Sequence, residues 1–81
     1  MQIDYDPQAD ALYIQLREGD VNDTQEINQY IYVDVDQSGV PLGIEILFAK
    51  RVLGEVDLAS ITVNISRPTE FAGDMTVFSA T

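Results

Sequence analysis

The fold of this chain is decided by residues 34–45, which read DVDQSGVPLGIE. Their spacing fits a calcium-binding loop, because oxygen-bearing side chains stand at positions 1, 3, 5 and 12 and a glycine at position 6. The same residues also fit two alternating strands joined by an Asp/Gly turn. The two interpretations predict different proteins, since a calcium loop of this kind lies between two helices.

The sequence on both sides of this stretch favours strands. Apolar residues occupy every second position through 12–17, 30–36 and 42–47, and these segments are rich in β-branched and aromatic residues. Such alternation is typical of half-buried antiparallel strands and not of helices. Pro41 also lacks the backbone donor that would pair two calcium loops. We therefore predict a hairpin, with its turn at Gly39.

A weak surface cation site stays open within that hairpin. Asp34 and Asp36 would point to one face, with Glu45 across from them. Together with the Ser38 hydroxyl, these carboxylates offer the hard oxygen ligands that calcium prefers. The candidate metal site therefore consists of Asp34, Asp36, Ser38 and Glu45.

Turn-forming residues and local patterns divide the rest of the chain into further elements. Residues 3–5 and 24–27 predict two more strands, each ended by turn-forming residues. Acidic residues in a first turn predict one short helix over 55–61. Residues 62–65 predict another strand, and residues 75–78 predict a last strand or an ordered tail.

These elements predict an α+β fold. We expect an antiparallel β-meander of about five strands in which sequence neighbours pair, with one short helix and a further C-terminal strand or ordered tail. Residues 1–65 would form the β-rich domain, and residues 66–81 a C-terminal extension that packs on the domain or on a partner subunit. The alternating positions predict a core of Ile3, Leu12, Ile14, Leu16, Ile31, Val33, Val35, Leu42, Ile44 and Ile46.

Size and missing residue types exclude several classes of function. A chain of 81 residues predicts one small domain, and domains of this size often associate because their cores are modest. The sequence has no cysteine and no histidine, which removes disulfides, thiolate zinc sites and the commonest general base. We see no phosphate-binding loop or nucleophile elbow, and we predict that the protein is not an enzyme and needs no cofactor. Without a visible signal sequence or membrane-spanning run, we expect a cytoplasmic protein.

Charge is distributed unevenly along the chain. The net charge is −10. Residues 1–49 hold seven Asp and three Glu against Arg17 alone, which gives −9 of that total. A surface this negative repels nucleic acids and anionic membranes and attracts a basic protein. The acidity is equally consistent with a role in solubility alone.

Two carboxylates, Asp6 and Asp10, lie close to Tyr5 in the sequence. Such a pair could hold a metal ion or carry out acid–base chemistry. The simpler interpretation is a turn that begins at Asp6-Pro7, in which the Asp side chains accept backbone hydrogen bonds. We favour the turn, because no third catalytic group is in view.

Three tyrosines, Tyr13, Tyr30 and Tyr32, fall opposite the aliphatic positions of their strands. They would suit a partner-binding surface, because tyrosine combines apolar area with a hydrogen-bonding tip. Alternatively, Phe71 and Phe78 from the C-terminal segment would cover them as a second small core.

Residues 5–16 read YDPQADALYIQL, and they are followed by YVDVD at 32–36 and GIEIL at 43–47. This succession resembles a family of short prokaryotic proteins, the domain of unknown function numbered twenty-two eighty-three. The likeness covers residues 1–61 in order and leaves out the tail from Ser66. It implies a compact β-rich domain with a short helix and no established activity. Some members sit beside small basic toxin-like proteins, which implies an antitoxin-like or partner role for those members.

The residues and the resemblance together predict an acidic domain that binds a basic protein or associates with itself. The contact would involve the tyrosine face or an open sheet edge. The alternative function is divalent-cation binding by Asp34, Asp36 and Glu45. We expect no direct nucleic-acid binding and no membrane binding.

Overall fold

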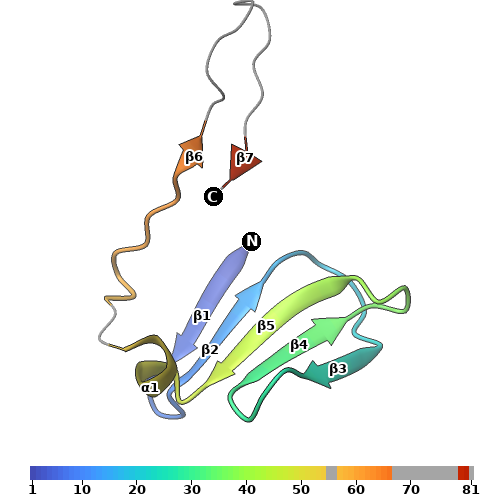
Figure 1. Ribbon diagram of the computed structural model, residues 1–81, viewed down its shortest axis with the longest axis horizontal. Coiled ribbons are helices and arrows are strands. Elements are labelled where there is room, and N and C mark those ends of the chain that lie inside the picture. Colours follow the sequence, from blue (N-terminus) through green and yellow to red (C-terminus); the bar gives the residue numbers. More distant parts are fainter. Residues whose placement is uncertain (55–56, 67–78, 81) are drawn as a thin grey trace, which may run out of the picture.

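The computed structural model describes residues 1–54, 57–66 and 79–80. Five strands form one antiparallel sheet in the spatial order β1-β2-β5-β4-β3 (Figure 1). The prediction of a five-stranded antiparallel sheet is confirmed, and so is the hairpin over residues 34–45, where β4 pairs with β5. The strands are β1 (Gln2–Asp6), β2 (Ala11–Gln15), β3 (Asp23–Glu26), β4 (Ile31–Val35) and β5 (Pro41–Leu47).

The strand order differs from a simple meander at one place. β2 pairs with β5 and not with β3, so the expectation that all sequence neighbours pair is wrong for β2 and β3. The composition of the strands explains the difference. β5 brings Ile44 and Ile46 opposite Ile14 and Leu12 of β2, whereas β3 reads DTQE and is exposed throughout. A polar strand is stable at an edge of the sheet, where its side chains stay in water.

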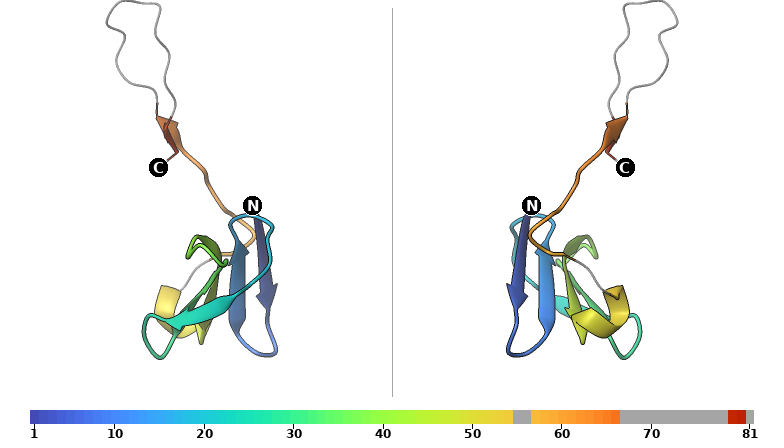
Figure 2. Two further views of the ribbon diagram at one scale, coloured as in Figure 1. Left: turned by 90° about the vertical axis from the view of Figure 1, so that its right-hand side faces the viewer. Right: turned by 90° about the vertical axis from the view of Figure 1, so that its left-hand side faces the viewer.

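One face of the sheet carries the aliphatic side chains and forms the core. Leu12 and Ile46, which the register places directly opposite each other, pack with Ala49. Ala49 begins the helix α1 (Ala49–Leu53), which follows β5 and covers one end of this face (Figure 2). Each large aliphatic side chain buried here contributes about 1.5–3 kcal/mol to folding.

Most of the predicted core is at least half-buried, and one residue is not. Ile3 lies on the edge strand β1 and is 38% exposed, so its assignment to the core is wrong. An edge strand has a neighbour on one side only, which leaves fewer side chains to pack over it. Ala49, only 1% exposed, was not indicated by strand alternation, because it belongs to the helix. The predicted residues that are buried are Leu12, Val35, Leu42 and Ile46, and those that are half-buried are Ile14, Leu16, Ile31, Val33 and Ile44.

The helix lies earlier in the chain than the predicted range 55–61. Residues 57–61 form a turn and an irregular segment, and residues 55–56 lie outside the described part of the chain. Asp57 closes that turn, because its carboxylate accepts the N–H of Ala59 at 3.0 Å. The acidic residue that we assigned to a first helical turn is therefore a turn former, which is a common alternative role of Asp.

Asp10, in the turn between β1 and β2, accepts hydrogen bonds from the first residues of α1. The N–H of Ala49 donates to the carbonyl oxygen of Asp10 at 2.9 Å, and the N–H of Lys50 donates to Asp10 Oδ1 at 3.2 Å. Phe48, the residue before the helix, makes no side-chain cap. Asp10 thus satisfies donors that a helix N-terminus otherwise leaves free. Because this cap comes from a distant part of the sequence, the local pattern gave no sign of the helix.

The described C-terminal residues form a separate two-stranded sheet, in which β6 (Ile65–Ser66) pairs with β7 (Ser79–Ala80). The prediction of a further C-terminal strand is confirmed. The strand predicted over 62–65 begins only at its last residue, and the element predicted over 75–78 lies outside the described residues. The division into residues 1–65 and 66–81 stays a prediction.

Candidate functional site

The sheet face opposite the core carries a row of alternating carboxylates and tyrosines. Directly opposed residues run from Asp4 to Tyr13, from Tyr13 to Glu45, from Glu45 to Tyr32 and from Tyr32 to Glu26. The row therefore crosses all five strands in their spatial order. Opposed residues share a face, with Cβ atoms about 4.5–5.5 Å apart. We call these five residues the tyrosine–carboxylate row.

Tyr13 is anchored across the neighbouring strand. Its hydroxyl donates to Oδ2 of Asp34 on β4 at 2.8 Å, although β5 lies between β2 and β4. Gly43 on β5 permits this reach, because a Cβ there would overlap the Tyr13 hydroxyl. The Thr24 hydroxyl donates to Oδ1 of Asp34 at 2.6 Å. Asp34 therefore links three strands, because its carboxylate accepts hydrogen bonds from two hydroxyl groups, one on β2 and one on β3.

The tyrosine hydroxyls of the row are held in their neutral form. The pKa of Tyr13 is raised from 10.0, first by its hydrogen bond to Asp34, then by burial and by the charges of Asp34 and Glu45. The pKa of Tyr32 is also raised from 10.0, first by burial, then by the charge of Glu26, its hydrogen bond to Glu26 and the charge of Glu45. The row thus presents carboxylates separated by uncharged aromatic rings.

The third predicted tyrosine, Tyr30, lies just before β4 and outside the paired row. Its ring meets Phe48 edge to face, with ring centroids 6.1 Å apart and ring planes at 85°. Phe48 is 57% exposed and has a φ of 52°, a left-handed conformation that is rare for a bulky residue. Sequence patterns did not indicate Phe48, because its exposure follows from the sharp turn between β5 and α1. Phe71 and Phe78, the alternative cover for the tyrosines, lie outside the described residues.

Asp6 ends β1 and Asp10 lies in the turn that follows, and each has structural partners. Asp6 Oδ1 accepts the N–H groups of Gln8 at 3.0 Å and Ala9 at 3.3 Å. Asp10 Oδ1 accepts the Tyr5 hydroxyl at 2.7 Å and also caps α1. The hydrogen bond to Asp10 is the main reason why the pKa of Tyr5 is raised from 10.0. Asp6 therefore makes the local turn contacts that the turn interpretation predicts, whereas the carboxylate of Asp10 contacts Tyr5 and the distant Lys50.

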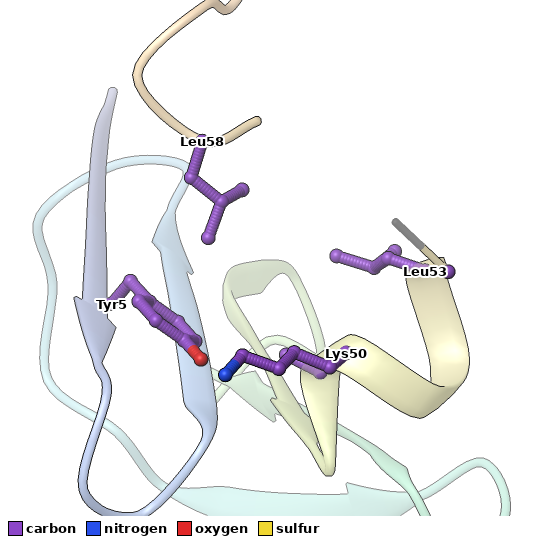
Figure 3. A pocket seen from close by; sticks show the side chains of 6 residues that line it. Tyr5, Lys50, Leu53 and Leu58 are labelled. Carbon is purple, nitrogen blue, oxygen red and sulfur yellow. The ribbon is translucent and has the colours of Figure 1, made fainter. Parts of the chain in front are cut away.

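A pocket lies on the core side of the sheet, between β1, α1 and residue 58 (Figure 3). Its volume is about 200 Å³. The pattern of the sequence could not reveal it, because its walls come from three separate segments that meet only when α1 docks on the sheet. The pocket is lined by Tyr5, Ala49, Lys50, Leu53, Gly54 and Leu58.

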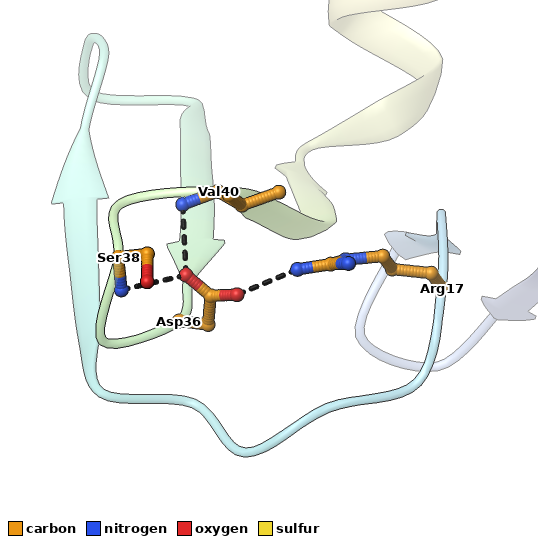
Figure 4. Close-up of polar contacts among 4 residues, drawn as sticks. All are labelled: Arg17, Asp36, Ser38 and Val40. Atoms are coloured by element: carbon orange, nitrogen blue, oxygen red, sulfur yellow. Dashed lines mark hydrogen bonds and ion pairs between the residues drawn. The ribbon is translucent and has the colours of Figure 1, made fainter.

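Asp36 closes the turn between β4 and β5 (Figure 4). Its Oδ1 accepts the N–H groups of Ser38 at 2.8 Å and Val40 at 2.9 Å, and its Oδ2 pairs with the Arg17 guanidinium at 2.5 Å. These partners, with the Val40 N–H first, hold the pKa of Asp36 below 3.8. Gly39 completes the turn with a φ of 83°, a conformation that glycine adopts at little cost.

The structure does not bring the candidate metal ligands together. Asp34 stands opposite Gly43, while Glu45 stands opposite Tyr32, so Glu45 does not face Asp34 across the strands. Ser38 contributes its backbone N–H to Asp36, and not its hydroxyl to an open site. In the part of the chain that the structure describes, no three Asp or Glu residues form a group that could hold a metal ion.

Fold and surface define a small antiparallel-sheet domain, with an aliphatic face covered at one end by a short helix and an acidic, tyrosine-bearing opposite face. The chain belongs to the family described as proteins of unknown function, DUF2283, whose model matches residues 2–50. The match begins with β1 and extends into α1, so it includes the whole five-stranded sheet. Neither the curated proteins nor the solved structures gave a match. Among the described residues, no helix has the length and hydropathy that membrane crossing requires.

Proposed function

We propose that this domain is not an enzyme and binds a basic protein partner through the tyrosine–carboxylate row. The row itself carries the proposal, because its alternation suits lysine and arginine side chains. A cationic group over a tyrosine ring gains cation–π attraction, and the flanking carboxylates accept its hydrogen bonds. An antitoxin-like role toward a small basic protein is the specific form that the family resemblance suggests.

The spacing of the row sets the geometry of the partner. Asp4, Glu45 and Glu26 stand on alternate strands of the sheet. Neighbouring strands are about 4.8 Å apart, which puts successive carboxylates of the row at intervals of roughly 10 Å. A helix repeats the same face after seven residues, a rise of about 10.5 Å. A partner helix with basic residues at every seventh position therefore matches the row.

The distribution of charge supports a partner outside the chain. Arg17, the single cation of residues 1–49, pairs with Asp36 in the β4–β5 turn. Within residues 1–54, 57–66 and 79–80, this is the one ion pair that forms. The carboxylates of the row thus have no ion-pair partner in the described part of the chain. A basic protein would gain both steering by the net charge of −10 and direct pairing at the row.

The non-enzymatic character rests on the use that the fold makes of its carboxylates. Asp6, Asp10, Asp34 and Asp36 all accept hydrogen bonds that close turns, cap α1 or link strands. The chain has neither histidine nor cysteine, so acid–base or nucleophilic chemistry would depend on carboxylates, tyrosines, hydroxyls or the single lysine, and these four aspartates already have structural roles.

Self-association is the second candidate, and a different surface favours it. Residues 58–66 contain no charged side chain, in contrast with the rest of this acidic sequence. Ile61, Val63 and Ile65 alternate within that segment and are 54%, 69% and 61% exposed. Exposed β-branched residues at strand spacing favour pairing with another chain. Light scattering at rising protein concentration distinguishes a dimer from a monomer that awaits a basic partner.

The row is tested with a helical peptide that carries lysine at every seventh position. We compare the double variant Glu26→Gln/Glu45→Gln with the control Glu18→Gln/Asp20→Asn, which changes net charge equally in an exposed loop. Removing two exposed ion pairs should weaken binding by roughly two- to thirtyfold. We expect faster dissociation only in the row variant, because distant charges act mainly on association. Equal losses in both variants, or no loss in the row variant, would refute the assignment.

A further inference from the structure

The pocket between β1 and α1 differs in charge from the rest of the molecule. The chain has 14 acidic residues and 4 basic ones, yet none of the six described residues that line the pocket is acidic. Among the described residues of its wall, Lys50 has the single charged side chain. Leu53 and Leu58 contribute apolar surface, as Figure 3 shows. An apolar hollow with one cation at its wall is suited to a ligand with an apolar body and an anionic group.

The position of Lys50 is fixed by its backbone and not by its ammonium group. Its N–H donates to Asp10, whose carboxylate also accepts the Tyr5 hydroxyl. Asp10 is thereby occupied by two donors, and no ion pair forms between it and the Lys50 ammonium. In the described residues the Lys50 ammonium takes part in no ion pair. The side chain can therefore bind an external anion without losing an ion-pair partner among the described residues.

We propose that this pocket binds a small apolar carboxylate, with its apolar part against Leu53 and Leu58 and its carboxylate on the Lys50 ammonium. The volume of about 200 Å³ limits the size of that molecule. A cavity of about 150 Å³ holds benzene, whereas drug-sized ligands occupy pockets of about 300–1,000 Å³. The ligand therefore has one ring or a short alkyl chain. A molecule of this size in an open pocket binds with a dissociation constant on the order of 1 mM.

This inference is independent of the proposed function, because the pocket and the row lie on opposite faces of the sheet. Tyr5, which lines the pocket, is opposed to Leu12 of the core. Asp4, at the end of the row, is opposed to Tyr13 on the other face. Failure of either proposal leaves the other intact, since different residues and different ligands test them.

The test uses benzoate as the probe, with benzamide as its uncharged analogue. Both are titrated into the full-length protein while amide and tyrosine ring signals are followed by NMR. We expect saturable shifts at Tyr5, Lys50 and Leu53, with benzoate binding more tightly than benzamide. Lys50→Gln should weaken benzoate binding by up to about fivefold, as expected for loss of one ion pair at an exposed lysine. It should leave benzamide binding unchanged.

Arg51→Gln is the matched control for this experiment. Arg51 follows Lys50 in α1, and its replacement changes net charge equally, but the residue does not line the pocket. We expect this variant to bind benzoate as the unaltered protein does. Three results would overturn the proposal: no saturation at tens of millimolar benzoate, equal benzoate binding by Lys50→Gln, or an equal loss in Arg51→Gln. The last result would show general attraction of the anion to a basic helix.

Discussion

Replacement of Gly43 by alanine tests the packing that organises the tyrosine-bearing face. Gly43 lies in β5 beneath the Tyr13 side chain, and a Cβ at this position would overlap the Tyr13 hydroxyl and ring. Its φ lies outside the left-handed region, so the backbone itself accepts alanine without strain. The effect of the substitution must therefore come from the steric conflict with Tyr13.

The expected loss of stability depends on how the Tyr13 ring responds to the added methyl group, and there are two ways. If the Tyr13 ring moves away, it loses its hydrogen bond to the charged Asp34, which is worth about 1.5–3 kcal/mol. If the ring stays, the overpacked site costs about 1–3 kcal/mol. Alanine also stabilises the folded protein by about 0.4–1 kcal/mol, because it reduces the conformational entropy of the unfolded chain. We therefore expect Gly43→Ala to lower the free energy of unfolding by about 1–2 kcal/mol.

Urea unfolding followed by circular dichroism measures this loss. The double variant Gly43→Ala/Tyr13→Ala supplies the control, because the conflict disappears once the tyrosine ring is gone. In the Tyr13→Ala background, Gly43→Ala should stabilise the protein by about 0.4–1 kcal/mol, because only the restriction of the unfolded chain then remains. The reasoning is refuted if Gly43→Ala is as stable as the unaltered protein, or if it destabilises both backgrounds equally.

Two further predictions concern Asp10, which caps α1, and Asp36, which closes the β4–β5 turn. Asp10→Ala should destabilise the protein by about 1–2 kcal/mol through loss of the α1 cap. It should remove hydrogen-exchange protection at Lys50, whose N–H donates to the Asp10 carboxylate, before the sheet amides, and uniform loss across the sheet would contradict this order. The lowered pKa of Asp36 predicts that Asp36→Asn is less stable than the unaltered protein above pH 3.8, the ordinary value of the group. The stability difference between the two proteins should shrink as pH falls through the lowered pKa of Asp36 in the folded state. A difference in urea midpoint that grows toward acid would contradict this direction.

Alternation along the strands was sufficient to predict the hairpin and the sheet. The pattern of β4 and β5 excluded the helix-flanked calcium loop, because an oxygen-ligand spacing is meaningful only in the right backbone context. The two-residue alternation of the strands also predicted that Tyr13 and Tyr32 share one face, and the register puts both opposite Glu45. It failed at Ile3, because a periodic pattern shows which way a side chain points and not how many neighbours cover it.

The sequence by itself determined the local features of this protein: two-residue alternation, turn-forming aspartates and an excess of negative charge. These follow from interactions between residues close in the chain, or from composition alone. Tertiary structure alone decided that β5 lies between β2 and β4, that α1 begins at Ala49, and that the Tyr13 ring lies over Gly43. Each of these features joins segments far apart in sequence, such as Asp10 with the helix it caps. Their stability comes from packing and hydrogen bonds that exist only after the segments meet, and no local pattern records those contacts.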